Sequence, residues 1–271
     1  MNRTFLLSLL LLTSCARSAE VDTAKLKVPA GFRVATFATL DASPRFMAFS
    51  PGGVLLVTAT SDGRVIALPD TNKDGRSDRL VNVLSDLAAP HGIAFYEGKL
   101  YIAVTDAVVR YDWDEAQLRA GNPKQLVKLP RGGMHFTRSI AFANGKMYVS
   151  AGSNCNVCDD EYGRAAVQEF NPDGTGGRLF ARGLRNSVGM DVSPVTGTVW
   201  AADNGRDWLG DELPPDEVND LGKSGGDFGW PYCYGKRVPD LKHSGESTRR
   251  CPSTVPAKFD LPAHSAALGM A

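Results

Sequence analysis

The sequence predicts an all-β fold of the propeller type, and three observations lead to this prediction. A unit of about 47 residues recurs along the 271-residue chain. Each unit holds two short apolar strands joined by a glycine-containing turn. Two strands cannot bury both of their faces alone, so sheets built from such units are expected to stack radially around an axis.

The register of the repeat follows from Ala48, Ala94, Ala141 and Asp191, which occupy equivalent positions. Their spacings of 46, 47 and 50 residues are typical of propeller blades. In chain order, every unit predicts a first strand, a turn and a second strand rich in Val, Ile, Tyr or Trp. The first residue and the turn glycine of the four units are Arg45 and Gly52, His91 and Gly98, Arg138 and Gly145, and Val188 and Gly197.

The chain ends in HSAALGMA, which resembles the first strand of a further unit, with Ala271 at the position of Ala48. The propeller domain is therefore predicted to cover residues 28–271, with about four blades and the start of a fifth. Because an open sheet edge promotes unwanted pairing, we expect the sequence to be a C-terminally truncated part of a six-bladed protein.

Residues 1–19 predict a lipoprotein-type signal peptide and N-terminal tether. Arg3 precedes an apolar run from Phe5 to Leu12, which is shorter than the roughly 20 residues that span a bilayer. The run ends in Leu-Thr-Ser-Cys, which is similar to a bacterial lipoprotein box with Cys15 as the lipidated residue. Ordinary cleavage a few residues later is the alternative. We expect export to the periplasm, with a lipid anchor as the only attachment to the membrane.

The charge balance excludes one class of partner. The chain has 30 basic and 30 acidic residues, so nothing indicates binding to nucleic acid or another polyanion.

Four cysteines remain besides Cys15, an even number that suits two disulfides in an oxidising compartment. Two of them lie in the stretch SNCNVC. Attachment of haem needs a histidine after the second cysteine, where Asp159 stands. A redox dithiol is expected at a helix N-terminus, and zinc needs two more ligands at matching spacing. These comparisons favour two disulfides, Cys155–Cys158 and Cys233–Cys251.

The repeat also predicts a site in the central funnel, where residues that precede the first strand of each blade gather. Six positions before the reference residues stand Ala42, Ala88, His135 and Arg185. A base and a cation on neighbouring blades at the same height indicate a binding or catalytic site. The alternative is structural, with His135 bonded to a neighbouring blade and Arg185 paired with a loop.

Three stretches around these residues carry a family resemblance. HFTRSIAFANGKMYVSAGSNCNVC, GLRNSVGMDVSPVTGTVWAADNGRDWLGDELPPDEVN and GGDFGWPYCYG follow one another in the chain. They resemble the glucose/sorbosone dehydrogenases that depend on pyrroloquinoline quinone (PQQ), and the L-sorbosone dehydrogenase branch most. The resemblance runs from Val28 to the last residue. It implies a six-bladed propeller, a sugar or sugar aldehyde as substrate, and electron transfer to a membrane quinone or periplasmic cytochrome.

The resemblance also implies roles for individual residues. His135 would be the general base that takes the hydroxyl proton, and Arg185 would stabilise charge on the quinone oxygen. Asn186 would hydrogen-bond the cofactor. The backbone carbonyls of Gly205 and Arg206 would bind a calcium ion that polarises the quinone. Acidic side chains that could shape this loop are Asp211, Glu212, Asp216 and Glu217.

The chain departs from the family pattern in two places. The soluble glucose dehydrogenases have an acidic residue supporting the base where this chain has Ser153, and Asp159 and Asp160 are candidate replacements. The basic residues that clamp the cofactor carboxylates belong to the last blades of the family, beyond this sequence. His91 and His264 are weaker candidates for the same funnel.

A second calcium signal lies in DTNKDGRSD, which begins like an EF-hand loop. Val81 stands where such a loop normally has a bidentate glutamate, so an Asx and glycine turn without metal is the alternative. Oxygen-bearing side chains fill loop positions 1, 3, 5 and 9, which are Asp70, Asn72, Asp74 and Asp78.

Two other functions compete with a PQQ-dependent dehydrogenase. A non-catalytic propeller lipoprotein that binds carbohydrate or protein would not need His135, Arg185 and the Gly205 loop together. A calcium-dependent lactonase would need acidic side chains at the axis, which the repeat does not supply. The residues therefore favour the dehydrogenase.

Overall fold

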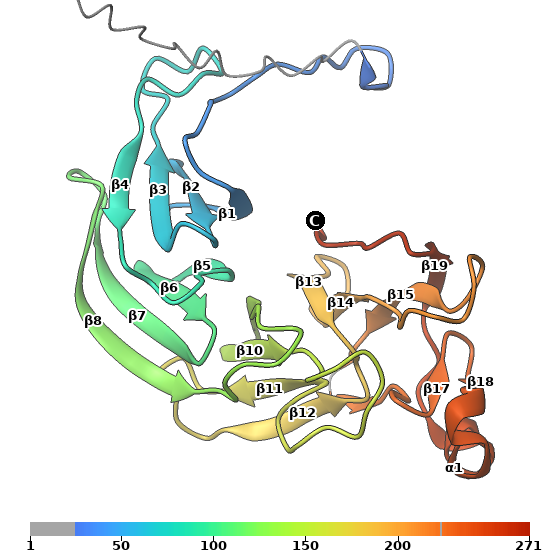
Figure 1. The fold of residues 1–271 in the computed structure, drawn as a ribbon. Helices are drawn as coiled ribbons and strands as arrows, with labels where there is room; N and C mark the ends of the chain where they lie inside the picture. The colour runs from blue at the N-terminus through green and yellow to red at the C-terminus, as the bar shows by residue number, and fades with distance from the viewer. Residues whose placement is uncertain (1–24, 223) are drawn as a thin grey trace, which may run out of the picture.

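The computed structural model describes residues 25–222 and 224–271, which form four blade sheets arranged in an arc around an axis and one small two-stranded sheet (Figure 1). The sheets follow one another like propeller blades, so the predicted all-β propeller is confirmed. Cys15 and the signal peptide predicted over residues 1–19 lie outside the described residues. In the part of the chain that is described, no helix is long and apolar enough to cross a membrane.

Each blade is an antiparallel sheet of four strands that run in chain order from the axis outwards (Figure 1). The first holds β1 (Pro44–Phe49), β2 (Leu55–Ala59), β3 (Arg64–Leu68) and β4 (Val81–Leu84); the second holds β5 (Ile93–Tyr96), β6 (Lys99–Val104), β7 (Ala107–Asp114) and β8 (Arg119–Lys128). The third holds β9 (Ile140–Ala143), β10 (Lys146–Ala151), β11 (Ala166–Phe170) and β12 (Arg178–Arg182); the fourth holds β13 (Ser187–Val192), β14 (Val199–Asp203), β15 (Pro215–Asp220) and β19 (Phe259–Ala263).

The innermost strands confirm the register of the repeat. Ala48, Ala94, Ala141 and Asp191 lie in β1, β5, β9 and β13 and pair with equivalent positions of the second strand in each blade. The strands β1, β5, β9 and β13 contact one another in succession. The segments that precede them are therefore brought together around the axis.

The hydrophobic cores lie between neighbouring blades because successive side chains of a strand point to opposite faces. On β6, Leu100 and Ile102 are buried against the first blade, where Leu56 belongs to the same cluster. Tyr101, on the opposite face, is buried with Val149 of the third blade. Both faces of an inner blade are apolar, and this explains the continuous apolar runs in the sequence.

The first blade is covered on its other face by the segment that precedes β1. Val57 and Ile66 are buried there against Phe37 and Leu40. This packing shields a face that has no neighbouring blade among the described residues.

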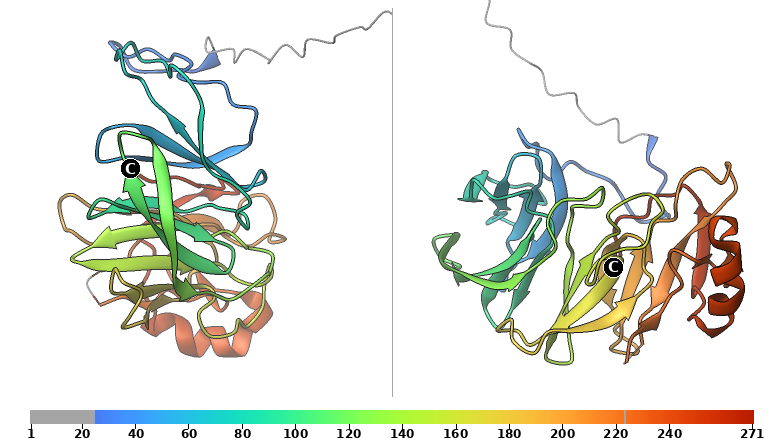
Figure 2. Two further views of the ribbon diagram at one scale, coloured as in Figure 1. Left: turned by 90° about the vertical axis from the view of Figure 1, so that its left-hand side faces the viewer. Right: turned by 60° about the horizontal axis from the view of Figure 1, so that its bottom comes forward.

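A long excursion separates β15 from β19 and stands at the outer rim of the fourth blade (Figure 2). Its first strand, β16 (Gly226–Asp227), pairs in parallel with β12 of the third blade. The remaining elements are β17 (Cys233–Tyr234), β18 (Val238–Pro239), the 3-10 turns η2 (Leu241–His243) and η3 (Cys251–Ser253), and the helix α1 (Ser244–Arg250). The repeat gave no indication of this helix.

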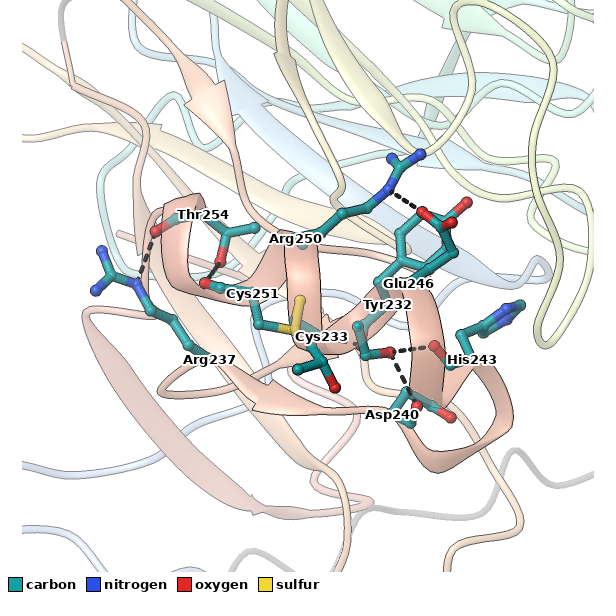
Figure 3. Close-up of a disulfide and its surroundings, with 12 residues drawn as sticks. Tyr232, Cys233, Arg237, Asp240, His243, Glu246, Arg250, Cys251 and Thr254 are labelled. Atoms are coloured by element: carbon teal, nitrogen blue, oxygen red, sulfur yellow. Dashed lines mark hydrogen bonds and ion pairs between the residues drawn. A yellow bond between two sulfur atoms is a disulfide. The ribbon is translucent and has the colours of Figure 1, made fainter.

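Both predicted disulfides are present. Cys233–Cys251 joins β17 to the end of α1, with an S–S distance of 2.07 Å (Figure 3). Cys155–Cys158 closes a tight turn in the loop between β10 and β11, with an S–S distance of 2.11 Å.

Candidate functional site

His135 lies between β8 and β9 and faces the axis, as the repeat predicts. The half-buried imidazole lines a cavity of about 320 Å³ together with Arg45 and Asn186. Its Nδ1 lies 2.7 Å from the carbonyl oxygen of Ser153. Because a carbonyl only accepts hydrogen bonds, Nδ1 carries a proton, and in the neutral ring Nε2 therefore holds the free lone pair.

The surroundings favour the neutral form of this imidazole. Burial lowers the pKa of His135 below its usual value, and the nearby positive charge of Arg185 lowers the pKa further, although the hydrogen bond to Ser153 raises it in part. A neutral ring with an available Nε2 can act as a proton acceptor near pH 7.

Gly152 lets His135 and Asn186 approach each other from two blades. A Cβ at this position would lie 2.6 Å from the Cβ of His135 and 2.7 Å from Oδ1 of Asn186. Any larger residue would therefore push the imidazole or the amide away from the cavity.

Arg138 holds the backbone on which His135 stands. The side chain is completely buried, and its guanidinium donates hydrogen bonds to the carbonyl oxygens of His135, Thr137 and Pro130 at 2.9, 2.8 and 2.7 Å. Arg138, which lies just before β9, thus fixes the backbone of the segment to which it belongs.

Arg185 lies between β12 and β13 and is 5% exposed. Its Nε and Nη2 donate to the backbone oxygen and to Oδ1 of Asn156 at 3.1 and 2.8 Å. Its Nη1 donates to the carbonyl oxygens of Asn204 and Gly205 at 3.1 and 2.8 Å. The guanidinium also lies over the ring of Trp230, at 5.5 Å from the ring centre.

Asp203, at the end of β14, fixes the backbone of the Arg185 segment. Its carboxylate accepts hydrogen bonds from the amides of Arg185 and Asn186 and from the hydroxyl of Ser187, all between 2.8 and 2.9 Å. Burial raises the pKa of Asp203 to about 6, against the lowering effect of these hydrogen bonds. Nearby Glu217 has a pKa raised to about 8, mainly by burial and then by the charge of Asp203.

The loop after β14 brings Gly205 and Arg206 next to Arg185. The amide of Gly205 donates to Oδ1 of Asp216 at 2.7 Å. The Arg206 side chain turns away to form a buried ion pair with Asp240, at 2.8 Å. A carbonyl oxygen has two lone pairs, so the Gly205 carbonyl can accept from Arg185 and still offer an oxygen to a cation.

The structure thus brings His135, Arg185, Asn186, Gly205 and Arg206 together, but in two layers. His135 and Asn186 line the cavity at the axis, whereas Arg185, Gly205 and Arg206 line a small cavity of about 20 Å³ behind it. An imidazole, an amide and the cationic Arg45 line the axial cavity, so it can accept a polar or anionic group.

Other sequence candidates lie away from this site. His91 is fully buried and hydrogen-bonds to the carbonyl oxygen of Arg138, so its role is structural. His264 is exposed and contacts the carbonyl oxygen of Gly210. Asp159 and Asp160 do not replace the missing acidic support, because they accept hydrogen bonds from Tyr232 and from Trp230 and Asn154.

The acidic loop residues divide into two kinds. Asp211 and Glu212 are exposed, whereas Asp216 and Glu217 on β15 are buried. Only Asp216 touches the Gly205 loop directly, through the amide of Gly205.

The carboxylates of the Asp70 to Asp78 loop bond to the loop itself. Asp70 accepts from the amides of Asp74 and Gly75, and Asp78 accepts from the amide and hydroxyl of Thr71. Within the described residues, no group of three or more His, Cys, Asp or Glu side chains could hold a metal ion. The geometry is that of an Asx turn, and calcium binding in this loop stays a prediction.

Sequence reasoning missed Asn156, Asp203 and Arg138, which hold His135 and Arg185 in place. Asn156 stands between the two cysteines of a disulfide, and Asp203 stands at the end of an inner strand. Both positions could have been singled out as polar residues at the funnel end of a blade.

Comparisons with known proteins agree with this architecture. A family model described as TrAA12-like matches residues 26–270. An uncharacterised protein of Borreliella burgdorferi is 30% identical over 278 residues, which cover 97% of this chain and 71% of that protein. A pyrroloquinoline quinone-dependent sugar dehydrogenase of Hypocrea jecorina is 27% identical over 229 residues, which cover 71% of this chain and 53% of that protein.

Solved structures show the same fold. The holo form of the PQQ domain of pyranose dehydrogenase from Coprinopsis cinerea matches with a TM-score of 0.79 at 24% identity, over 90% of this chain and 71% of that chain. A calcium structure of the Trichoderma reesei enzyme of family AA12 matches with a TM-score of 0.77 at 23% identity, over 86% of this chain and 71% of that chain.

Proposed function

The chain belongs to the TrAA12-like family of propellers, and we propose that it acts as a PQQ-dependent dehydrogenase of a sugar or sugar aldehyde. The observation that carries this proposal is the pairing of His135 with Arg185 around Ser153. The carbonyl oxygen of Ser153 accepts from His135, and its amide donates to the carbonyl oxygen of Arg185 at 2.7 Å. Ser153 thereby connects a base that lines the axial cavity to a fixed cation that lines the small cavity behind it.

Each residue has a defined task in the proposed reaction. The free Nε2 of His135 takes the proton of the substrate hydroxyl as the hydrogen on the same carbon leaves as hydride. When bound, PQQ supplies the quinone that accepts this hydride, and calcium polarises its carbonyl. Arg185 stabilises negative charge that develops beside it, and Asn186 donates a hydrogen bond into the cavity.

The proposal extends to the electron acceptor and the location. Lipidation at Cys15 would anchor the exported chain to a membrane, and the electrons would then pass to a membrane quinone or a periplasmic cytochrome. The apolar run from Phe5 to Leu12 behind Arg3 supports export. The two disulfides support it as well, since disulfides persist in oxidising compartments.

The test is reconstitution with PQQ and calcium of the purified protein, in a chain extended to full propeller length. Dye reduction is followed with a panel of aldoses and with sorbosone, and PQQ binding is measured by equilibrium dialysis. Turnover that disappears in His135→Ala, with PQQ still bound, is the expected result. Sugar binding without turnover would instead support a carbohydrate-binding propeller, and failure to bind PQQ would overturn the proposal.

A further inference from the structure

The turn closed by Cys155–Cys158 contains a buried polar side chain. Asn156 is 6% exposed, and its Oδ1 accepts hydrogen bonds from Nη2 of Arg185 at 2.8 Å and from the amide of Asp207 at 3.0 Å. Its backbone oxygen accepts a third hydrogen bond, from Nε of Arg185. Asn156 thus accepts hydrogen bonds from both Nε and Nη2 of Arg185.

Arg185 is a buried cation without an anionic hydrogen-bond partner. Among the described residues, its guanidinium donates only to uncharged oxygens, on Asn156, Asn204 and Gly205. No carboxylate forms an ion pair with it in this part of the chain, although buried arginines usually have one. Its positive charge is therefore held in place without being neutralised by a direct contact.

The same turn also reaches the base. Ser153, three residues before Asn156, accepts the hydrogen bond of His135 through its carbonyl oxygen. The stretch from Ser153 to Asn156 therefore touches both functional side chains, and the disulfide joins its end to Cys158.

We propose that Asn156 is a positioning residue, which orients Arg185 through a neutral acceptor and is itself held by the Cys155–Cys158 turn. This inference rests on the proposed function for the role of Arg185. An amide oxygen suits the task because it aligns the guanidinium without cancelling its charge, and that charge is what stabilises a developing anion. An aspartate would give the same alignment but would compensate the charge.

Two substitutions separate the alignment of the Arg185 guanidinium from the neutral charge of its acceptor. Asn156→Ala removes Oδ1, the acceptor of Nη2, and leaves the backbone oxygen that accepts from Nε. Asn156→Asp keeps a side-chain oxygen for Arg185 and for the Asp207 amide. Asn154→Ala is the matched control, because Asn154 lies exposed in the same stretch and forms a hydrogen bond only through its backbone. Melting curves of each variant establish that it is folded.

The first measurement is independent of turnover. Solvent exchange of the Nη2–H group of Arg185, which donates to Oδ1 of Asn156, is followed by low-temperature NMR on the full chain labelled with ¹⁵N-arginine, and Arg185→Lys assigns the signal. A hydrogen bond to a charged group has a strength that corresponds to roughly 10- to 100-fold, so exchange is expected to become about tenfold faster in Asn156→Ala. It is expected to stay slow in Asn156→Asp and in Asn154→Ala. Equal exchange rates in Asn156→Ala and the wild type overturn the proposal.

The second measurement separates alignment from charge. We expect kcat for dye reduction to fall about tenfold or more in both Asn156→Ala and Asn156→Asp, with KM for the sugar within about twofold. Full activity of Asn156→Asp would overturn the requirement for a neutral acceptor. If the wild type neither binds PQQ nor turns over, the proposed function fails, whereas the exchange measurement still decides whether Asn156 positions Arg185.

The disulfide is tested by the double variant Cys155→Ser, Cys158→Ser. Exchange of the Arg185 Nη2–H group is expected to accelerate several-fold, because the turn that presents Asn156 is no longer closed. Unchanged exchange would overturn the part of the proposal that gives the disulfide this role.

Discussion

His135 and Arg185 are attached to opposite ends of one residue, Ser153. Nδ1 of His135 lies 2.7 Å from the carbonyl oxygen of Ser153. The amide nitrogen of Ser153 lies 2.7 Å from the carbonyl oxygen of Arg185. The hydrogen bond fixes the tautomer of the imidazole, and the proximity of the guanidinium disfavours a second positive charge. In this chain, a backbone carbonyl therefore orients the imidazole of His135.

The first prediction concerns the charge state of His135. Burial and the charge of Arg185 both lower its pKa, so NMR titration of the histidine ring protons should give a midpoint below the usual value near 6.5. Arg185→Gln removes the positive charge and should raise the midpoint. A midpoint at or above 6.5 in the wild type would contradict the neutral base, because the ring would then be largely protonated in mildly acidic buffer.

The second prediction concerns turnover. His135→Gln should lower kcat by roughly 10²- to 10⁴-fold, the range expected for loss of a general base, while PQQ binding changes little. His243→Ala is a matched control, since this histidine packs against Tyr232 in the excursion on the rim. Retention of most of the activity in His135→Gln would exclude a role as the base.

The propeller could be predicted from the sequence because the repeat marks a physical requirement. Every inner strand must be apolar on both faces, and the turn glycines recur with the same period, so Ala48, Ala94 and Ala141 identify the blades. The same register placed His135 and Arg185 at the axis. The disulfides followed from cysteine number and spacing.

The supports of the site could not be predicted in this way. Asn156, Arg138 and Asp203 act through single contacts across blades, and such contacts leave no period in the sequence. Arg206 was expected to bind calcium through its carbonyl oxygen. Its side-chain ion pair with Asp240 depends on the excursion between β15 and β19. The excursion, with helix α1, lies outside the repeat and so gave no signal.

The third prediction concerns Arg138. Its guanidinium is completely buried and satisfies three carbonyl oxygens before β9. Arg138→Met leaves those oxygens without a donor, so the free energy of unfolding should fall by roughly 2–4 kcal/mol. Denaturant unfolding measures the loss, and an unchanged midpoint would show that water replaces the guanidinium without cost.

The fourth prediction concerns acid stability. Burial lowers the pKa of His91 to about 4, with a smaller contribution from the charges of Arg45 and Arg138. The unfolded chain takes up a proton near pH 6.5 and the folded chain does not, so stability falls as the pH drops from 6.5 to 4. The loss from this residue is roughly 3 kcal/mol. Urea midpoints measured at several pH values should fall less steeply between pH 6.5 and 4 in His91→Gln than in the wild type. The same pH dependence in both proteins would contradict the prediction.

The last prediction compares the two disulfides. The chain-entropy estimate gives about 3 kcal/mol for the loop closed by Cys233–Cys251 and about 2 kcal/mol for the shorter loop closed by Cys155–Cys158. Replacing both members of each pair by serine and measuring denaturant midpoints tests this order.

The longer loop also carries Asp240, the partner of Arg206. Loss of Cys233–Cys251 should therefore loosen the Gly205 loop and weaken calcium-dependent PQQ binding, whereas Asp240→Asn should weaken binding with the disulfide intact. If the double serine variant lost stability but bound PQQ and calcium as the wild type does, the excursion would stabilise the fold without supporting the site. If Asp240→Asn alone weakened binding, the ion pair would be the connection between the rim and the axis.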